Sequence, residues 1–210
     1  MTSRLNRRRR VALLLLTCTA VVTFAAPASA AQIGAGPAAP TYRPDGQIAV
    51  ACEYVPDWYG PCNPNWIGDN VYNTTGKNQK RSYTDYLQYG GEPDPRVIVF
   101  RILIQNDGSV ADRFRVDADG VTTGYVVKFF RKSTNVTSAV DAGTYATGVI
   151  APGASVVLKA KVVMPCPSHD DCGRDRAYDI AQRLVTIRSV GDPLTRDAVK
   201  FVRKPWVCTC

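Results

Sequence analysis

Short runs in which apolar and polar residues alternate recur along the chain from about residue 97 onward. A period of two places successive side chains on opposite faces of a β-strand, so each run predicts a strand with one buried face. Stretches rich in Gly, Pro, Asn and Asp, such as 105–108 and 151–153, separate the runs and predict turns. The expected buried positions are Ile98, Phe100, Ile102 and Ile104; Phe114 and Val116; Tyr125, Val127 and Phe129; Val156, Leu158, Ala160 and Val162; Val185 and Ile187; and Val199 and Phe201.

Strands at this spacing, without alternating helices, predict an all-β fold, an antiparallel β-sandwich. One segment is ambiguous, because residues 176–188 also fit one face of a helix, and a short helical turn followed by a strand is expected there. The predicted organisation is a signal peptide (1–30), a flexible leader rich in Ala, Pro and Gly (31–49), a Cys- and aromatic-rich segment packed on the sandwich (50–95), and the sandwich itself (96–210).

The first thirty residues have the layout of a secretory signal peptide. Arg4 and residues 7–10 are basic, residues 11–26 are apolar, and an Ala-Ser-Ala motif ends at Ala30. The alternative is an uncleaved anchor, but a membrane-spanning helix needs roughly 20 apolar residues. We therefore expect Sec-type export, cleavage after Ala30, and a secreted protein with no stable membrane anchor.

Removal of the signal peptide changes the charge of the chain. Of 26 Lys and Arg residues, five lie in residues 1–30, so 21 remain against 18 acidic residues. The formal net charge then falls from +8 to near +3. The remaining basic residues are scattered along the sequence, which is not the dense basic stripe of a nucleic-acid binder. No nucleic-acid partner is expected.

Six of the seven cysteines lie beyond the signal peptide and occur in pairs. They are Cys52, Cys62, Cys166, Cys172, Cys208 and Cys210. An even number of cysteines in an exported chain predicts disulfides, here with 15 possible connectivities. Cys166 and Cys172 flank a short loop and are candidates for a local bridge. At least one of Cys208 and Cys210 is expected to bridge to the first pair.

Other roles for these cysteines are less well supported. Zinc binding needs ligands at metal spacing, but there is no Cys-x-x-Cys pair and His169 is the only histidine. A redox dithiol at Cys208-Thr209-Cys210 remains an alternative, although the βαβ pattern of thioredoxin-like proteins is absent from the sequence. Structural disulfides and no cofactor are the prediction.

Several motifs within residues 97–165 resemble bacterial immunoglobulin-like modules of secreted and cell-surface proteins. Those modules commonly read N-x-G-x-x-x-D, then an aromatic strand, then a Pro-Gly turn, then a Val-rich strand. Here the first motif is Asn106, Gly108 and Asp112, and the turn is Ala151-Pro152-Gly153. The resemblance implies an immunoglobulin-like sandwich and says little about function, because such modules serve as spacers, adhesion units and companions of carbohydrate-binding domains.

Catalytic and metal-binding patterns are weak. A Ser-His-Asp or Cys-His arrangement would have to use His169, which has no G-x-S-x-G partner, and the chain has only two glutamates. We expect no enzyme. Residues 117–120 (Asp-Ala-Asp-Gly) resemble part of a calcium loop, to which residues 68–70 or 169–171 could add oxygens. A hairpin turn at Asp119-Gly120 explains the same residues without metal.

The aromatic segment is the best candidate for recognition. Trp58, Tyr59, Trp66 and Tyr72 are candidate ligand-binding residues, since exposed rings can stack on sugars or anchor a protein partner. The alternative is that these rings close one end of the sandwich. We expect a secreted, non-catalytic protein with a structural or interaction role and an unknown protein or glycan partner at the bacterial cell surface or in the medium. The alternatives are a carbohydrate-binding module and a protease inhibitor that presents the loop between Cys166 and Cys172.

Overall fold

The structure is a computed structural model, and it describes residues 38–51, 65–85, 97–164 and 180–205. Several predictions concern residues outside this part of the chain. They are the signal peptide, Trp58, Tyr59, His169 and the six cysteines Cys52, Cys62, Cys166, Cys172, Cys208 and Cys210.

The described residues form strands joined by short connections and one helix of a single turn. The elements are β1 (Pro44–Val50), β2 (Lys80–Asp85), β3 (Val97–Asn106), β4 (Phe114–Thr123), β5 (Val126–Arg131), β6 (Thr134–Asn135), α1 (Thr137–Asp141), β7 (Tyr145–Ala146), β8 (Ser155–Val163), β9 (Ile180–Ser189) and β10 (Arg196–Pro205). The helix α1 is five residues long, and none of the described helical residues forms a span long and apolar enough to cross a membrane.

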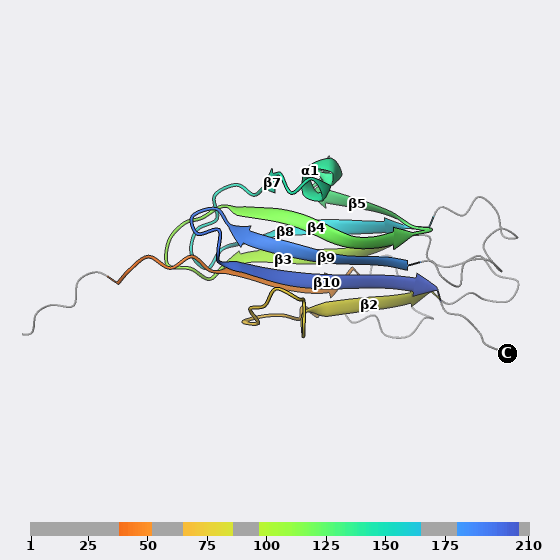
Figure 1. Cartoon of the computed structure of the whole chain (residues 1–210), viewed down its shortest axis with the longest axis horizontal. Helices are drawn as coiled ribbons and strands as arrows, with labels where there is room; N and C mark the ends of the chain where they lie inside the picture. The colour runs from red at the N-terminus through yellow and green to blue at the C-terminus, as the bar shows by residue number, and fades with distance from the viewer. Residues whose placement is uncertain (1–37, 52–64, 86–96, 165–179, 206–210) are drawn as a thin grey trace, which may run out of the picture. The chain divides into compact units, whose positions relative to one another are not determined.

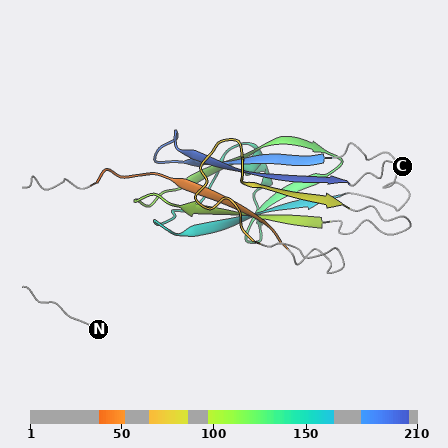
Figure 2. The same cartoon turned by 90° about the horizontal axis from the view of Figure 1, so that it is seen from below.

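The strands form two five-stranded sheets, one in the order β1-β3-β8-β5-β6 and the other in the order β2-β10-β9-β4-β7 (Figure 1). Seen from below, the two sheets are separate layers, with the blue strands β9 and β10 in one and β3 and β8 in the other (Figure 2). The prediction of an all-β fold is confirmed. The pairings between named strands are antiparallel except that of β2 with β10, which is parallel, so the second sheet is mixed.

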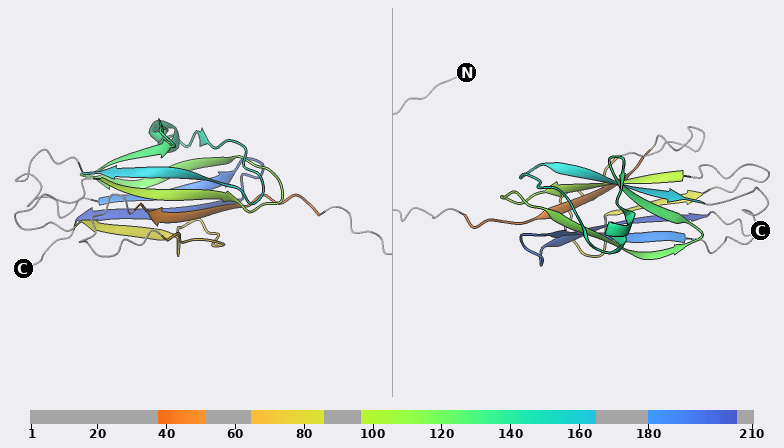
Figure 3. Two further views of the ribbon diagram at one scale, coloured as in Figure 1. Left: turned by 180° about the vertical axis from the view of Figure 1, so that it is seen from behind. Right: turned by 90° about the horizontal axis from the view of Figure 1, so that it is seen from above.

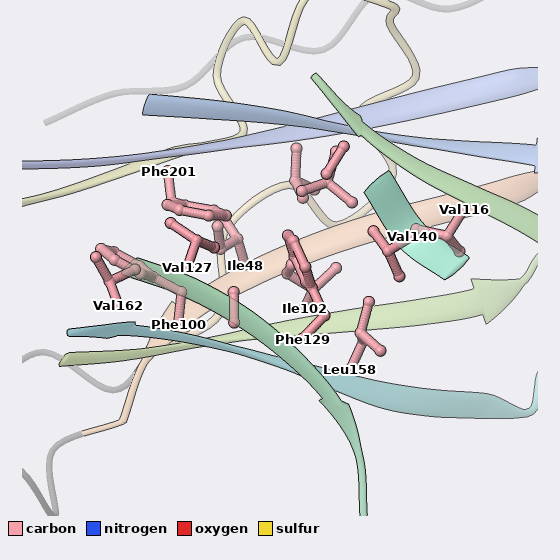
Figure 4. Close-up of a cluster of buried hydrophobic side chains, with 14 of the residues drawn as sticks. Ile48, Phe100, Ile102, Val116, Val127, Phe129, Val140, Leu158, Val162 and Phe201 are labelled. Atoms are coloured by element: carbon pink, nitrogen blue, oxygen red, sulfur yellow. The ribbon is translucent and has the colours of Figure 1, made fainter. Parts of the chain in front are cut away.

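The core lies between the sheets and includes the predicted inward positions, of which Val156 is only partly buried, together with residues that were not predicted, such as Ile48 and Val140. Phe100 of β3 stacks on Phe201 of β10, with ring centroids 4.9 Å apart, and Phe129 of β5 packs on Phe201 at 6.4 Å. Figure 4 shows these rings with Ile102 and Leu158. Aromatic and branched aliphatic side chains from both sheets thus exclude water along the interface, which is the main stabilising contribution to such a fold.

Other elements pack beside the two sheets at two places. The helix α1 packs against β4 of one sheet and β5 of the other (Figure 3). Its Val140 is fully buried in the core. At the opposite edge, Ile67 forms an antiparallel bridge with Ile48 of β1, through N–H···O distances of 2.9 and 3.0 Å. An open strand edge invites pairing with other chains, so this bridge protects β1.

Two boundary predictions are wrong, whereas the strand expected at the end of the segment 176–188 is present. The flexible leader was predicted to extend over residues 31–49, but Pro44–Val50 form the buried strand β1, so its predicted end lies inside a strand. The segment 50–95 is more than an elaboration packed on the sandwich, since it supplies β2. Within the ambiguous segment 176–188, the described residues from Ile180 onward are strand β9, and the earlier ones lie outside the described part.

The hairpin turn predicted at Asp119-Gly120 is also wrong, because both residues lie inside β4. Gly120 has φ +141°, and a Cβ atom there would lie 2.1 Å from the backbone oxygen of Gln182 on the neighbouring strand. Glycine is therefore required by the close approach of β9 to β4 rather than by a turn.

Candidate functional site

Two of the four predicted recognition residues, Trp66 and Tyr72, are described, and both are partly buried. The Tyr72 hydroxyl donates to Asp107 Oδ2 at 2.6 Å and lies 3.1 Å from Asn70 Oδ1, and the Arg43 guanidinium lies 3.8 Å from the ring centroid. Burial raises the pKa of the Tyr72 hydroxyl, and the bond to Asp107 adds to the effect. Tyr72 thus uses both its ring and its hydroxyl in contacts within the fold.

Residues 65–79, here named the edge segment, are tied to the sandwich by Asp197 at the start of β10. Asp197 Oδ2 accepts from the Gly46 amide of β1 and from Gln79 Nε2, each at 2.7 Å. Its Oδ1 accepts from the Asn73 amide at 2.8 Å. Burial raises the pKa of Asp197, while these donors act in the opposite direction. One carboxylate therefore joins β1, β10 and the edge segment.

Asp45 of β1 is a less satisfied carboxylate beside this junction. Its side chain is fully buried, Oδ2 accepts from Gln47 Nε2 at 3.1 Å, and Oδ1 has no hydrogen-bond partner. The same Gln47 nitrogen donates to Asp69 Oδ1 at 2.9 Å. Burial raises the pKa of Asp45 to about 6, and the nearby charges of Asp107 and Asp197 raise it too, against the bond from Gln47.

The residues of the N-x-G-x-x-x-D motif hold loops at one end of the sheets. Asn106 Nδ2 donates to the carbonyls of Val110 and Ile150, each at 2.8 Å, and Asn106 Oδ1 accepts from the Gly108 amide at 3.0 Å. The backbone carbonyl of Asn106 accepts from the Gly153 amide at 2.7 Å, so the motif and the Pro-Gly turn are bonded to each other.

Asp112, the last residue of the motif, connects the same end to β9. Its carboxylate accepts from the Ser189 hydroxyl and from the Gly191 amide, the latter at 3.1 Å. It also accepts from the adjacent Arg113 amide at 2.7 Å. These polar residues have a structural role, since each buried hydrogen bond that they make fixes a loop to a strand.

Of the residues considered for calcium, residues 169–171 lie outside the described part of the chain, and the others are not brought together. Asp117 Oδ1 lies 3.9 Å from Arg188 Nη2, and Asp119 Oδ1 accepts from the Gly120 amide, both on β4. Asp69 instead bonds Gln47 beside β1, in the other sheet. Among the described residues, no group of three or more Asp, Glu, His or Cys side chains could hold a metal ion.

The outward face of the first sheet carries a group of cations that sequence reasoning did not recognise as a group. Arg101 of β3 alternates with the buried Phe100 and Ile102, and Lys159 and Lys161 of β8 alternate with buried residues in the same way. The strand register sets Arg101 opposite Lys159, and Lys161 opposite Lys128 of β5. We name Arg101, Lys128, Lys159 and Lys161 the basic face.

Within the described strands that carry this basic face, no carboxylate balances its charge. The sequences of β3, β5 and β8 contain no Asp or Glu, and none of the four cations forms an ion pair with a described residue. Lys128 and Lys159 are exposed, and Arg101 and Lys161 are partly exposed. In the sequence these four cations occupy the outward positions of alternating strands, but only the register between the strands shows that they are neighbours.

No protein-family model matches the chain, and no curated protein matches it. Among solved structures, a FixG-related protein from Vibrio parahaemolyticus is similar over 58% of this chain and 86% of its own, with 10% identity and a TM-score of 0.32. The secreted serine protease VesC from Vibrio cholerae is similar over 61% of this chain and 22% of its own, with 10% identity and a TM-score of 0.34. The N-terminal domain of PorA is similar over 75% of this chain and 96% of its own, with 9% identity and a TM-score of 0.36.

Proposed function

We propose that the mature protein is an exported, non-catalytic β-sandwich module with a structural or interaction role at the bacterial cell surface or in the medium. The observation that supports the proposal most directly is that the buried polar side chains make hydrogen bonds between separate parts of the fold. Asp197, Asp112 and Asn106 each join separate elements by hydrogen bonds, as in a rigid scaffold. The cations of the basic face lie instead on the outward side of the first sheet, where Lys128 and Lys159 are exposed, and such a charged surface is suited to binding.

The immunoglobulin-like assignment is part of the same proposal. It is supported by the structural role of the motif residues, because Asn106, Gly108 and Asp112 hold the loop that joins β3 to β4. Gly108 also lies where a Cβ atom would approach the Thr41 carbonyl oxygen to 2.4 Å, so a larger residue would displace the N-terminal chain. A scaffold that needs these residues for loop geometry explains their spacing without a catalytic role.

Disulfide cross-linking is also proposed, on the basis of where the described chain ends. Cys52 is one residue beyond Ala51, and the Ala51 amide donates to the carbonyl of Val99 near the start of β3. Cys166 is two residues beyond Met164, next to Val163, which pairs with Val97. Residues 51 and 163, which precede these two cysteines in the sequence, therefore lie at the same end of the first sheet.

Export and binding can be tested together. The full chain is expressed in a bacterial host, and the mature protein is recovered from the medium and from the cell-wall fraction. We expect an N-terminus at Ala31, saturable retention on washed cells, and no turnover of generic peptide, ester or glycoside substrates. An intact Met1 on exported protein would contradict the signal peptide. Substrate turnover that a single substitution abolishes would contradict the non-catalytic role.

A further inference from the structure

We propose that the basic face binds a linear anionic polymer of the extracellular surface, one whose phosphate or carboxylate groups are carried on a sugar or polyol backbone. The inference rests on the interaction role proposed above and names the chemistry of its partner. It starts from the arrangement of four cations on three adjacent strands, with Lys128 opposite Lys161 and Lys159 opposite Arg101.

The spacing of these cations suits a chain of charges rather than a single ion. Opposite side chains on neighbouring strands lie about 5 Å apart, and residues two apart on one strand lie about 7 Å apart. The path from Lys128 through Lys161 and Lys159 to Arg101 is therefore a stepped line across β5, β8 and β3. An extended polyanion can place successive charges along such a line.

A purely structural reason for this arrangement is difficult to find. Like charges directly opposite each other on a sheet are destabilising. Lysines on an edge strand can prevent aggregation, but β8 is an internal strand with β3 on one side and β5 on the other. Lys159 and Lys161 are thus flanked by like charge without serving as edge protection, and a bound polyanion would offset the repulsion.

The partner is more consistent with an anionic glycan or polyol phosphate than with a nucleic acid. Most of the outward side chains that adjoin the cations are aliphatic, including Leu103, Val157 and Val126, and the ring of Phe130, which lies opposite Lys159, is only partly exposed. One partly buried ring is not the series of exposed rings on which successive bases of a nucleic acid stack. The proposed export of the chain would bring it into contact with anionic polymers of the cell envelope.

The test uses the mature full chain with poly(glycerol phosphate), polygalacturonate, double-stranded DNA and neutral dextran as probes. The variant K128S/K159S/K161S removes three cations from the basic face. The matched control K80S/R196S/K204S removes three exposed cations from strands of the other sheet, with the same change in net charge. Binding is measured by titration at several salt concentrations, and thermal unfolding is recorded for all three proteins.

We expect the wild type and the control to bind one or both of the glycan and polyol polymers, and the basic-face variant to lose about tenfold or more in affinity. The logarithm of affinity should fall with the logarithm of salt with a slope near −2 for about three contacts, and the slope should flatten in the variant. The melting temperature of the variant should be unchanged or higher.

Equal losses in both variants would show that net charge alone governs binding and would overturn the proposal. Preferential binding of DNA would replace the glycan assignment, and a lowered melting temperature in the basic-face variant alone would assign these lysines a structural role. Retention on washed cells that survives K128S/K159S/K161S would reject the basic face while leaving the proposed interaction role intact.

Discussion

At the scale of single residues, the two buried carboxylates of the β1 edge differ in how well they are satisfied. Both oxygens of Asp197 accept hydrogen bonds, so its burial cost is offset by three donors. Asp45 has one bonded oxygen and one without a partner, beside the charges of other aspartates. A buried group with an unmade bond is costly, and it costs more when ionised.

Asp45 should therefore make stability fall as the pH rises. Because its folded-state pKa of about 6 exceeds its ordinary value of 3.8, the folded protein binds the proton more tightly. This contribution is fully present below about pH 4 and is lost as the pH passes 6, and it amounts to roughly 2–3 kcal/mol. In denaturant unfolding at pH 4 and pH 7.5, D45N should gain stability relative to wild type only at the higher pH.

D69N is the control for this measurement, since Asp69 is an exposed carboxylate bonded to the same Gln47 amide. A gain in D69N equal to that in D45N, or a gain in D45N at pH 4, would show that burial of Asp45 is not the cause.

Replacing Asp197, in contrast to replacing Asp45, should lower the stability of the folded protein. D197A leaves the Gly46 amide, the Asn73 amide and the Gln79 side chain without their acceptor, and it should cost about 3 kcal/mol or more. D119A removes a carboxylate bonded only to the neighbouring Gly120 amide among described contacts, and it should change stability by about 0.5 kcal/mol or less. Similar losses in urea unfolding would contradict the role assigned to Asp197.

At the scale of elements, the period-two pattern predicted the core strands well. The four apolar positions of β3, from Ile98 to Ile104, are fully buried, and Val185, Ile187, Val199 and Phe201 of β9 and β10 are likewise buried. The alternation of apolar and polar residues indicates which face of a strand is apolar, and in these strands the apolar face packs against the other sheet.

The failures came where local sequence lacks that alternation. Every residue of β1 is buried, because the edge segment covers the face that would otherwise meet solvent. The polar residues Asp45 and Gln47 therefore occupy buried positions, and the sequence of β1 does not alternate as an ordinary strand would. Sequence also missed the basic face, because register is a tertiary property. The polar junction at Asp197 was not anticipated, since its partners are 118 to 151 residues away.

The β3 assignment can be measured with a matched pair on one strand. Phe100 is fully buried and stacks on Phe201, so F100A should cost about 3–5 kcal/mol in denaturant unfolding. Arg101 points outward and has no ion pair with a described residue, so R101A should change stability by about 0.5 kcal/mol or less. Equal losses would show that the inward and outward assignments of β3 are wrong.

At the scale of the whole molecule, the cysteines make the clearest prediction. Alkylation of the native mature protein without reductant, followed by mass spectrometry, should find no free thiol, because six cysteines can pair evenly in an oxidising compartment. Reduction should then expose six reactive sites. Two labelled cysteines in folded, unreduced protein would favour the redox alternative at Cys208 and Cys210 instead.

The parallel pairing of β2 with β10 has a consequence for when the chain can become native. In the described sheet β2 is an edge strand whose neighbour is β10, and the junction that holds β1 also needs Asp197 of that last strand. In a chain that emerges from a ribosome or an export channel in sequence order, β1 and β2 therefore cannot make these native contacts until β10, which begins at residue 196, has also emerged. Such distant contacts slow folding. If the chain is exported as proposed, that delay would keep it unfolded and able to pass through a narrow export channel.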